Sequence, residues 1–241
     1  MAVLPLLVTT NMDKYSIEIV DNHIICLIDG KRVLLDTGAP NSISDGNSLL
    51  LLGKNFSFSP SFMGFSTDEL SNQVGTEINI LLGGDVLKHL NFFVDWENKT
   101  ILFSSTAFKY KGARAPLDFF MNIPIVLLNI DGKIIRAFLD TGAKLSYLNP
   151  DLTSNHSLLG TALDFYPGFG QFNTYIYEVP VILADHTFTI IAGHLPNLLQ
   201  MTLMMANTSG ILGNDIFKYF DVSFNFQIEE LILVKRNSKA A

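Results

Sequence analysis

The amino-acid sequence predicts a mainly β fold built from two copies of one unit, and three observations support this. Apolar residues come in short runs that Gly, Asn, Asp and Pro interrupt, as is typical of many short strands. Asp-Gly pairs that begin at residues 29 and 131 are turn sequences of two-residue β-hairpins. The hairpin sequence IDGK and a second motif after it both occur twice, which indicates internal duplication.

The expected elements follow from these runs. Strands are predicted at 15–19, 23–28, 123–130, 174–183 and 188–193, and short helices at 86–90 and 216–220. Residues 81–103 match residues 211–233 without a gap. The stretch KYKGARAP at 109–116 is basic and contains Gly and Pro, so we expect an exposed linker there. The predicted lobes are therefore residues 1–110 and 111–241.

Composition excludes several classes of protein. Hydrophobic residues make up 48% of the 241 residues and charged residues 16%, which excludes a disordered chain. The net charge is −7 without a cluster of Lys and Arg, so we expect no nucleic-acid partner. Apolar runs fall short of the roughly 18 residues that a membrane span needs. One cysteine, Cys26, excludes an internal disulfide, and together with the lack of a signal peptide this favours a cytoplasmic location.

The second repeated motif carries the chemistry. It reads LLDTGAPNSIS at 34–44 and FLDTGAKLSYL at 138–148, so each copy supplies one aspartate, Asp36 or Asp140. Duplicated units related by an approximate twofold axis would bring the two carboxylates together. Carboxylates about 3 Å apart cannot both ionise, so one can act as general base on a water while the other donates a proton. This chemistry requires neither a metal nor a cofactor, and we expect none.

Each Asp-Thr-Gly motif is followed further along by Leu-Leu-Gly or Ile-Leu-Gly, and this pairing resembles the pepsin and retropepsin superfamily of aspartic proteases. The resemblance implies a bilobal acid-protease fold of two pseudo-twofold-related, β-barrel-like lobes with few short helices. It implies Asp36 and Asp140 as the catalytic pair and an extended peptide or protein substrate bound as an added strand. The residues that it assigns to support the pair are Thr37, Gly38, Ala39, Thr141, Gly142 and Ala143, with Gly83 and Gly213 in the crossing loops.

The alanines at 39 and 143 resemble retropepsins, whereas pepsins usually carry a hydroxyl residue there. Without that hydroxyl the pair should have higher pKa values, so we predict a mildly acidic activity optimum. One chain that carries both acids needs no second copy, so a monomer is expected. A compact, retropepsin-like endopeptidase is the favoured interpretation. The alternatives are a weak or inactive peptide-binding protein with the same fold, and a two-carboxylate glycosidase.

Three further features are open. A flap over the cleft could come from the first half through Phe62, Met63 and Phe65, or from the Gly-rich hairpin of the second half through Tyr166 and Gly168. The segment 194–209 is interpreted as a packed core helix or loop rather than a methionine-lined binding surface. Asp85 and Asp215 follow the crossing glycines and are predicted to cap short helices.

Overall fold

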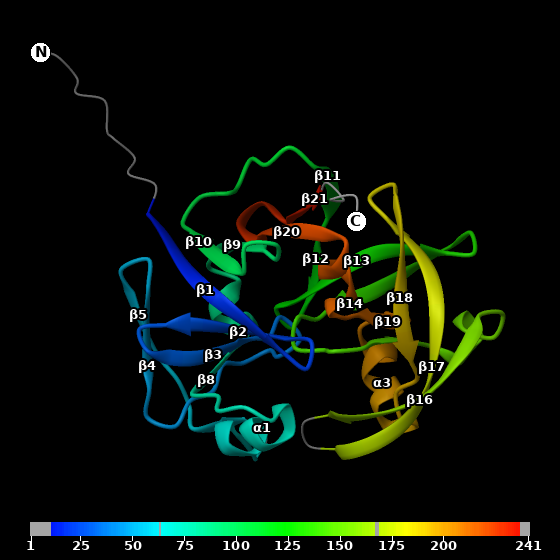
Figure 1. Ribbon diagram of the computed structural model, residues 1–241, viewed down its shortest axis with the longest axis horizontal. Helices are drawn as coiled ribbons and strands as arrows, with labels where there is room; N and C mark the ends of the chain where they lie inside the picture. The colour runs from blue at the N-terminus through cyan, green and yellow to red at the C-terminus, as the bar shows by residue number, and fades with distance from the viewer. Residues whose placement is uncertain (1–10, 63, 167–168, 237–241) are drawn as a thin grey trace, which may run out of the picture.

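The computed structural model describes residues 11–62, 64–166 and 169–236, and it confirms a mainly β fold (Figure 1). Two large sheets, of nine and eight strands, contain most of the strand residues of the described chain. Short α-helices and 3₁₀-helices lie between the strands along the chain. The helical elements are α1 (Thr67–Val74), α2 (Gly84–Leu87), α3 (Asn197–Met205), η1 (Pro150–Leu152), η2 (Asn214–Lys218) and η3 (Phe226–Ile228).

The nine-stranded sheet contains strands from both halves of the chain, in the order β11-β21-β20-β9-β10-β1-β2-β3-β8. Its strands are β1 (Met12–Val20), β2 (His23–Ile28), β3 (Lys31–Leu35), β8 (Ile80–Leu82), β9 (Asn91–Asp95), β10 (Thr100–Ser104), β11 (Ala113–Pro116), β20 (Phe220–Asn225) and β21 (Glu230–Lys235). The halves meet where β9 pairs with β20. There Phe92 stacks on Phe224 with ring centroids 4.3 Å apart, so side-chain packing reinforces the backbone pairing.

The eight-stranded sheet belongs to the second half and has the order β12-β13-β14-β19-β15-β18-β17-β16. Its strands are β12 (Asp118–Phe120), β13 (Ile123–Ile130), β14 (Lys133–Leu139), β15 (Ser146–Leu148), β16 (Ser157–Tyr166), β17 (Gly170–Leu183), β18 (His186–Gly193) and β19 (Gly210–Leu212). The smaller pairs are β4 (Ser48–Leu51) with β5 (Lys54–Ser57) and β6 (Ser61–Phe62) with β7 (Phe65–Ser66). The long β16–β17 hairpin extends toward α1, as Figure 1 shows.

Local sequence signals account for the hairpins. Asp29 and Gly30 both have positive φ, at 49° and 75°, as the type I′ turn between β2 and β3 requires. Asp131 and Gly132 make the same turn between β13 and β14. The five predicted strands are confirmed. The two predicted helical segments are confirmed in part: residues 86–87 lie in α2 and residues 216–218 in η2, whereas Phe220 already belongs to β20. The linker prediction is wrong for residues 113–116, because they form β11 and pair with β21.

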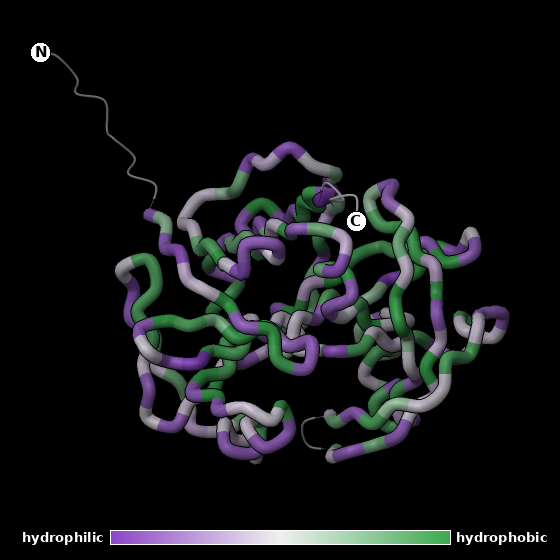
Figure 2. The backbone as a smooth tube through the Cα atoms, viewed as in Figure 1, coloured by the Kyte–Doolittle hydropathy of each residue, from purple (hydrophilic) through white to green (hydrophobic). Residues whose placement is uncertain are grey.

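The buried core follows the apolar runs. Figure 2 shows hydrophobic segments concentrated along the inner strands and hydrophilic ones at turns and surface loops. Cys26 is fully buried within β2. Among the described residues, no helix is long and apolar enough to cross a membrane. Because the nine-stranded sheet takes strands from both halves, sheet membership does not divide the chain at residue 110, and the two-lobe division stays a prediction.

Candidate active site

Each Asp-Thr-Gly loop begins where a buried strand ends beside a parallel neighbour. In the first half β3 pairs with β8, and in the second half β14 pairs with β19. The N–H of Asp36 donates to the carbonyl of Leu82 at 3.0 Å, and the N–H of Asp140 donates to that of Leu212 at 2.9 Å. The two copies of the motif therefore place their aspartates at equivalent positions.

The two loops pack against each other through their glycines. A Cβ atom built on Gly38 would lie 2.2 Å from Cγ of Asp140, and one on Gly142 would lie 2.3 Å from Cγ of Asp36. Each carboxyl group therefore occupies the space that a side chain on the opposite loop would need. The side chains of Asp36 and Asp140 also hydrogen-bond to each other. The structure thus brings together the two residues that the sequence singles out.

The two threonines hold the loops in this arrangement. The N–H of Thr37 donates to Oγ1 of Thr141 at 3.0 Å, and the N–H of Thr141 donates to Oγ1 of Thr37 at 2.9 Å. Each hydroxyl then donates across the interface, that of Thr37 to the Leu139 carbonyl and that of Thr141 to the Leu35 carbonyl, at 2.6 and 2.8 Å. Both side chains are buried. The four reciprocal hydrogen bonds fix the loops against each other, as a preorganised site requires.

Hydrogen bonds and burial act in opposite directions on the carboxyl groups. Oδ1 of Asp36 accepts from the N–H groups of Gly38 and Ala39, both at 2.9 Å, and Oδ1 of Asp140 accepts from that of Gly142 at 2.8 Å. These bonds favour the charged form, but burial outweighs them and raises the pKa of both carboxyls. The negative charge of Asp140 raises the pKa of Asp36 further. Burial and the second carboxyl therefore favour a state in which the two aspartates share one proton, and the titration belongs to the pair.

The crossing glycines contact the backbone of the same loops. A Cβ on Gly83 would lie 2.8 Å from the carbonyl oxygen of Ala39, and one on Gly213 would lie 2.6 Å from that of Ala143. A serine from each loop completes the arrangement. The N–H of Gly83 donates to Oγ of Ser42 at 2.8 Å, and that of Gly213 to Oγ of Ser146 at 3.1 Å. The positions predicted to support the pair therefore all lie in or against its two loops.

Asp85 and Asp215 are not the N-cap residues of their helices, although Oδ1 of Asp85 accepts from one first-turn N–H of α2, that of Val86, at 2.9 Å. The helices α2 and η2 begin at Gly84 and Asn214, and their N-cap residues are Gly83 and Gly213. Oδ1 of Asp85 also accepts from the N–H and hydroxyl of Ser42, at 2.9 and 2.6 Å, and so fixes the first loop to α2. Asp215 accepts from the N–H of Ile191 at 2.7 Å. The two aspartates occupy matched sequence positions but have different partners, which the repeat could not reveal.

Tyr166, one of the flap candidates, lies near the pair. Burial, with the charges of Asp140 and Asp36, raises the pKa of Tyr166 to about 12. The preceding residue, Phe165, packs against a buried cluster of the first half that also contacts Ala39. One further contact joins the halves here, from Nε2 of Gln171 in β17 to Oε1 of Gln73 in α1, at 3.2 Å. The β16–β17 hairpin therefore reaches across to the first half beside the aspartates.

The other flap candidates differ in position. Phe65 packs against the same cluster as Phe165, whereas Phe62 is exposed to solvent. Met63 and Gly168 lie outside the described residues. Which segment serves as a flap stays a prediction.

The helix α3 only partly fits the packed-helix interpretation of 194–209. Leu199 and Leu203 are buried, in a cluster that also contacts Ala143 and Tyr166. The methionines lie on the opposite face and are exposed. These exposed residues are Met201, Met204 and Met205. The prediction is thus right for the leucines and wrong for the methionines.

A contact between the halves that sequence reasoning missed lies at the β1–β2 turn. Nδ2 of Asn22 donates to the carbonyl of Lys144 at 2.7 Å, and Nδ2 of Asn214 donates to the carbonyl of Asn22 at the same distance. The Asp-Asn pair between two apolar runs is a recognisable hairpin turn, and both residues have positive φ. Its docking on the second loop joins residues more than a hundred positions apart, which no local pattern encodes.

No protein-family model matches this chain, and no curated protein matches it.

Proposed function

We propose that this protein is an aspartic endopeptidase of the pepsin and retropepsin type, with a single-chain, two-lobed organisation. One observation carries the proposal: Asp36 and Asp140, from the two copies of the motif, pack reciprocally against Gly142 and Gly38 and hydrogen-bond to each other. Two contacting carboxyls that share one proton can supply a base and an acid at the same place.

The proposed reaction uses a water held between the two carboxyl groups. Asp140, which is ionised, takes a proton from the water, and the oxygen of the water bonds to the peptide carbonyl carbon. Asp36, which is protonated, gives its proton to the carbonyl oxygen, so a neutral gem-diol forms. Asp140 then returns its proton to the leaving nitrogen as the C–N bond breaks, and one gem-diol hydroxyl gives its proton back to Asp36. Both carboxyls finish in their starting states.

Burial and the interaction between the two aspartates are the basis for this division of roles. Asp36 has the more strongly raised pKa, because burial and the charge of Asp140 act together on it. Asp140 accepts from Gly142 N–H and from the protonated Asp36, and both bonds stabilise its charge. The proposed substrate is an extended peptide, which can add as a strand beside the pair. A two-carboxylate glycosidase is disfavoured, because its acids stand about 5–9 Å apart rather than in contact.

The decisive experiment is cleavage of a mixed peptide library across a pH series. The wild type is expected to cut within peptides, and Asp36→Asn and Asp140→Asn to lose that activity. Asp118→Asn, which changes an exposed aspartate of β12, serves as the matched control and should keep it. If the wild type binds peptides but never cleaves them at any pH, the protein is a binding protein with this arrangement of loops, and the proposal fails.

A further inference from the structure

Beside the aspartate pair, four charged and polar side chains form a connected cluster. Nζ of Lys144 lies 2.9 Å from Oδ2 of Asp21 and 3.7 Å from Oδ1 of Asp164. The hydroxyl of Tyr147 donates to Oδ2 of Asp164. Asp164 is the most buried ionic member, with 6% of its side chain exposed, against 20% for Lys144 and 57% for Asp21. We call these residues, Asp21, Lys144, Tyr147 and Asp164, the anchor cluster.

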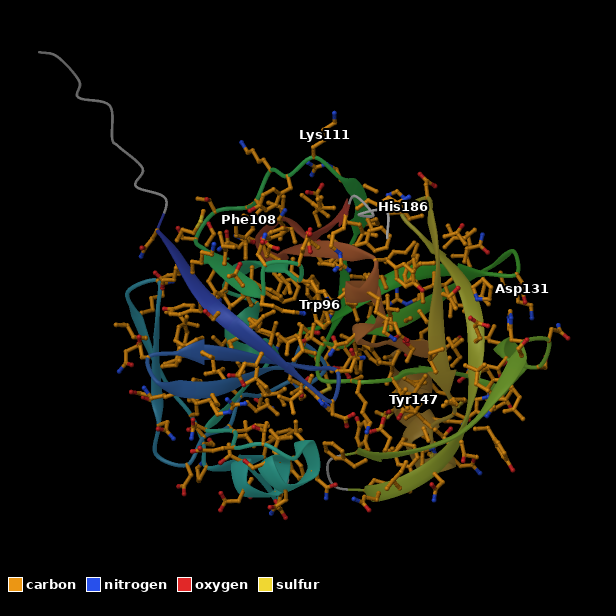
Figure 3. All side chains as sticks on the ribbon, in the orientation of Figure 1. Trp96, Phe108, Lys111, Asp131, Tyr147 and His186 are labelled. Carbon is orange, nitrogen blue, oxygen red and sulfur yellow. The ribbon has the colours of Figure 1, made fainter. Side chains whose placement is uncertain are left out.

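The anchor cluster joins three parts of the molecule. Lys144 follows Ala143 directly in the second catalytic loop, and Tyr147 lies in β15 immediately beyond that loop. Asp164 belongs to β16 of the long hairpin, whereas Asp21 lies in the β1–β2 turn of the first half. Figure 3 labels Tyr147 within the second half. The cluster therefore ties the hairpin and the first half to the loop that carries Asp140.

Strand geometry connects the anchor cluster to the site. Side chains alternate along a strand, so Asp164 and Tyr166 lie on the same face of β16, two residues apart. Tyr166 is close enough to the pair for the charges of both aspartates to raise its pKa. Phe165, on the other face, packs against the first-half cluster that contacts Ala39. A displacement of β16 at Asp164 would therefore move Tyr166 relative to Asp36 and Asp140.

A buried carboxylate such as Asp164 is retained only where partners satisfy it. Its oxygens accept from the hydroxyl of Tyr147 and, at 2.9 Å, from the N–H of Phe165, with the ammonium of Lys144 nearby. Both side-chain partners come from the segment that follows the second Asp-Thr-Gly motif. This segment includes β15, which is not a neighbour of β16 in the sheet, because β18 and β17 lie between them. Asp164 thus supplies a side-chain link where the sheet supplies no backbone link.

We propose that Asp164 is a positioning residue, which ties β16 to the second catalytic loop and so holds Tyr166 against the aspartate pair. The inference rests on the proposed function for its effect on the reaction, but the tie itself can be measured without substrate. Asp164 acts through Lys144 and Tyr147 and takes no part in the proton transfers.

The test compares Asp164→Asn, Tyr147→Phe and Lys144→Met with the wild type. Hydrogen exchange followed by mass spectrometry, on the full chain without substrate, should show protection of the β16–β17 amides reduced at least about tenfold in each variant. Peptide hydrolysis should show kcat reduced about 10- to 100-fold with KM changed less than about threefold. The reason is that a displaced Tyr166 would weaken stabilisation of the transition state more than binding of the substrate. Lys144→Arg, which keeps the cation, should recover most of the loss of Lys144→Met.

Asp118→Asn removes an exposed carboxylate paired with Arg136 in the same half, so it is the control and should alter neither measurement. If Asp164→Asn does not fold, Tyr147→Phe and Lys144→Met carry the test alone. If all the anchor-cluster variants had the same hydrogen exchange and the same kcat as the wild type, the inference would be overturned and the endopeptidase proposal would stand. An inactive wild type whose exchange still depends on Asp164 and Tyr147 would overturn the endopeptidase proposal and keep the tie.

Discussion

Replacing Thr37 with valine tests the paired threonines directly, because valine keeps the shape of the side chain and removes only the hydroxyl. In the structure that hydroxyl accepts from the N–H of Thr141 at 2.9 Å and donates to the carbonyl of Leu139 at 2.6 Å. Both backbone groups belong to the buried interface between the loops, so the substitution leaves them without this partner. Each unsatisfied buried group costs about 1–3 kcal/mol, so we expect the free energy of unfolding to fall by about 2–6 kcal/mol.

The assay is equilibrium unfolding in urea, with Thr187→Val as the control at an exposed position of β18. Thr141→Val should cost as much as Thr37→Val, because Thr141 makes the same two bonds to Thr37 and Leu35. The reasoning would be refuted if Thr37→Val lowered the free energy of unfolding by less than about 0.5 kcal/mol, as the control does. Surface substitutions fall in that range. A large difference between the two threonine variants would also refute it.

Three further predictions concern the pair itself. Gly38→Ala places a methyl group where the carboxyl of Asp140 lies, so we expect hydrolysis to fall below detection in the peptide assay, and a fully active variant would contradict the packing. Asp36→Asn should raise the free energy of unfolding near pH 7 and change it little below pH 3.8, the ordinary pKa of the carboxyl. Folding raises the pKa of Asp36, so its carboxyl destabilises the protein as pH rises from the unfolded-state pKa toward the folded-state pKa, and asparagine removes this effect. Urea unfolding at both pH values checks the sign, and equal effects at both would contradict it. The pH–rate profile of the wild type should peak at mildly acidic pH, because Ala39 and Ala143 bring no hydroxyl to the carboxyls, and a maximum at strongly acidic pH would contradict this.

Local patterns predicted what local forces determine. The Asp-Gly turns at 29 and 131, the short strands and the equivalent places of Asp36 and Asp140 all follow from the sequence, since the repeated segments fold by the same backbone pairing. The repeat could not predict contacts in which its two copies differ. Asp85 braces Ser42 whereas Asp215 binds the Ile191 N–H, because their surroundings come from unrelated parts of the chain.

Helix α3 illustrates the same limit on a smaller scale. Leu199 and Leu203 are four residues apart and mark one buried face. The three methionines are also apolar, so composition alone could not show which face the protein covers. The tie between Lys144 and Asp164 was equally hidden, because it joins two segments that are not neighbours in the sheet.

The shared nine-stranded sheet has a consequence for how the chain would respond to a single cut. Lys111 is exposed on the crossover between the halves and points outward at the top of Figure 3. Hydrolysis of the backbone there would yield two fragments, each with one aspartate of the pair. Pairing of β9 with β20, with Phe92 stacked on Phe224, would hold the fragments together without a covalent connection, so two separate polypeptides could reconstitute the complete site.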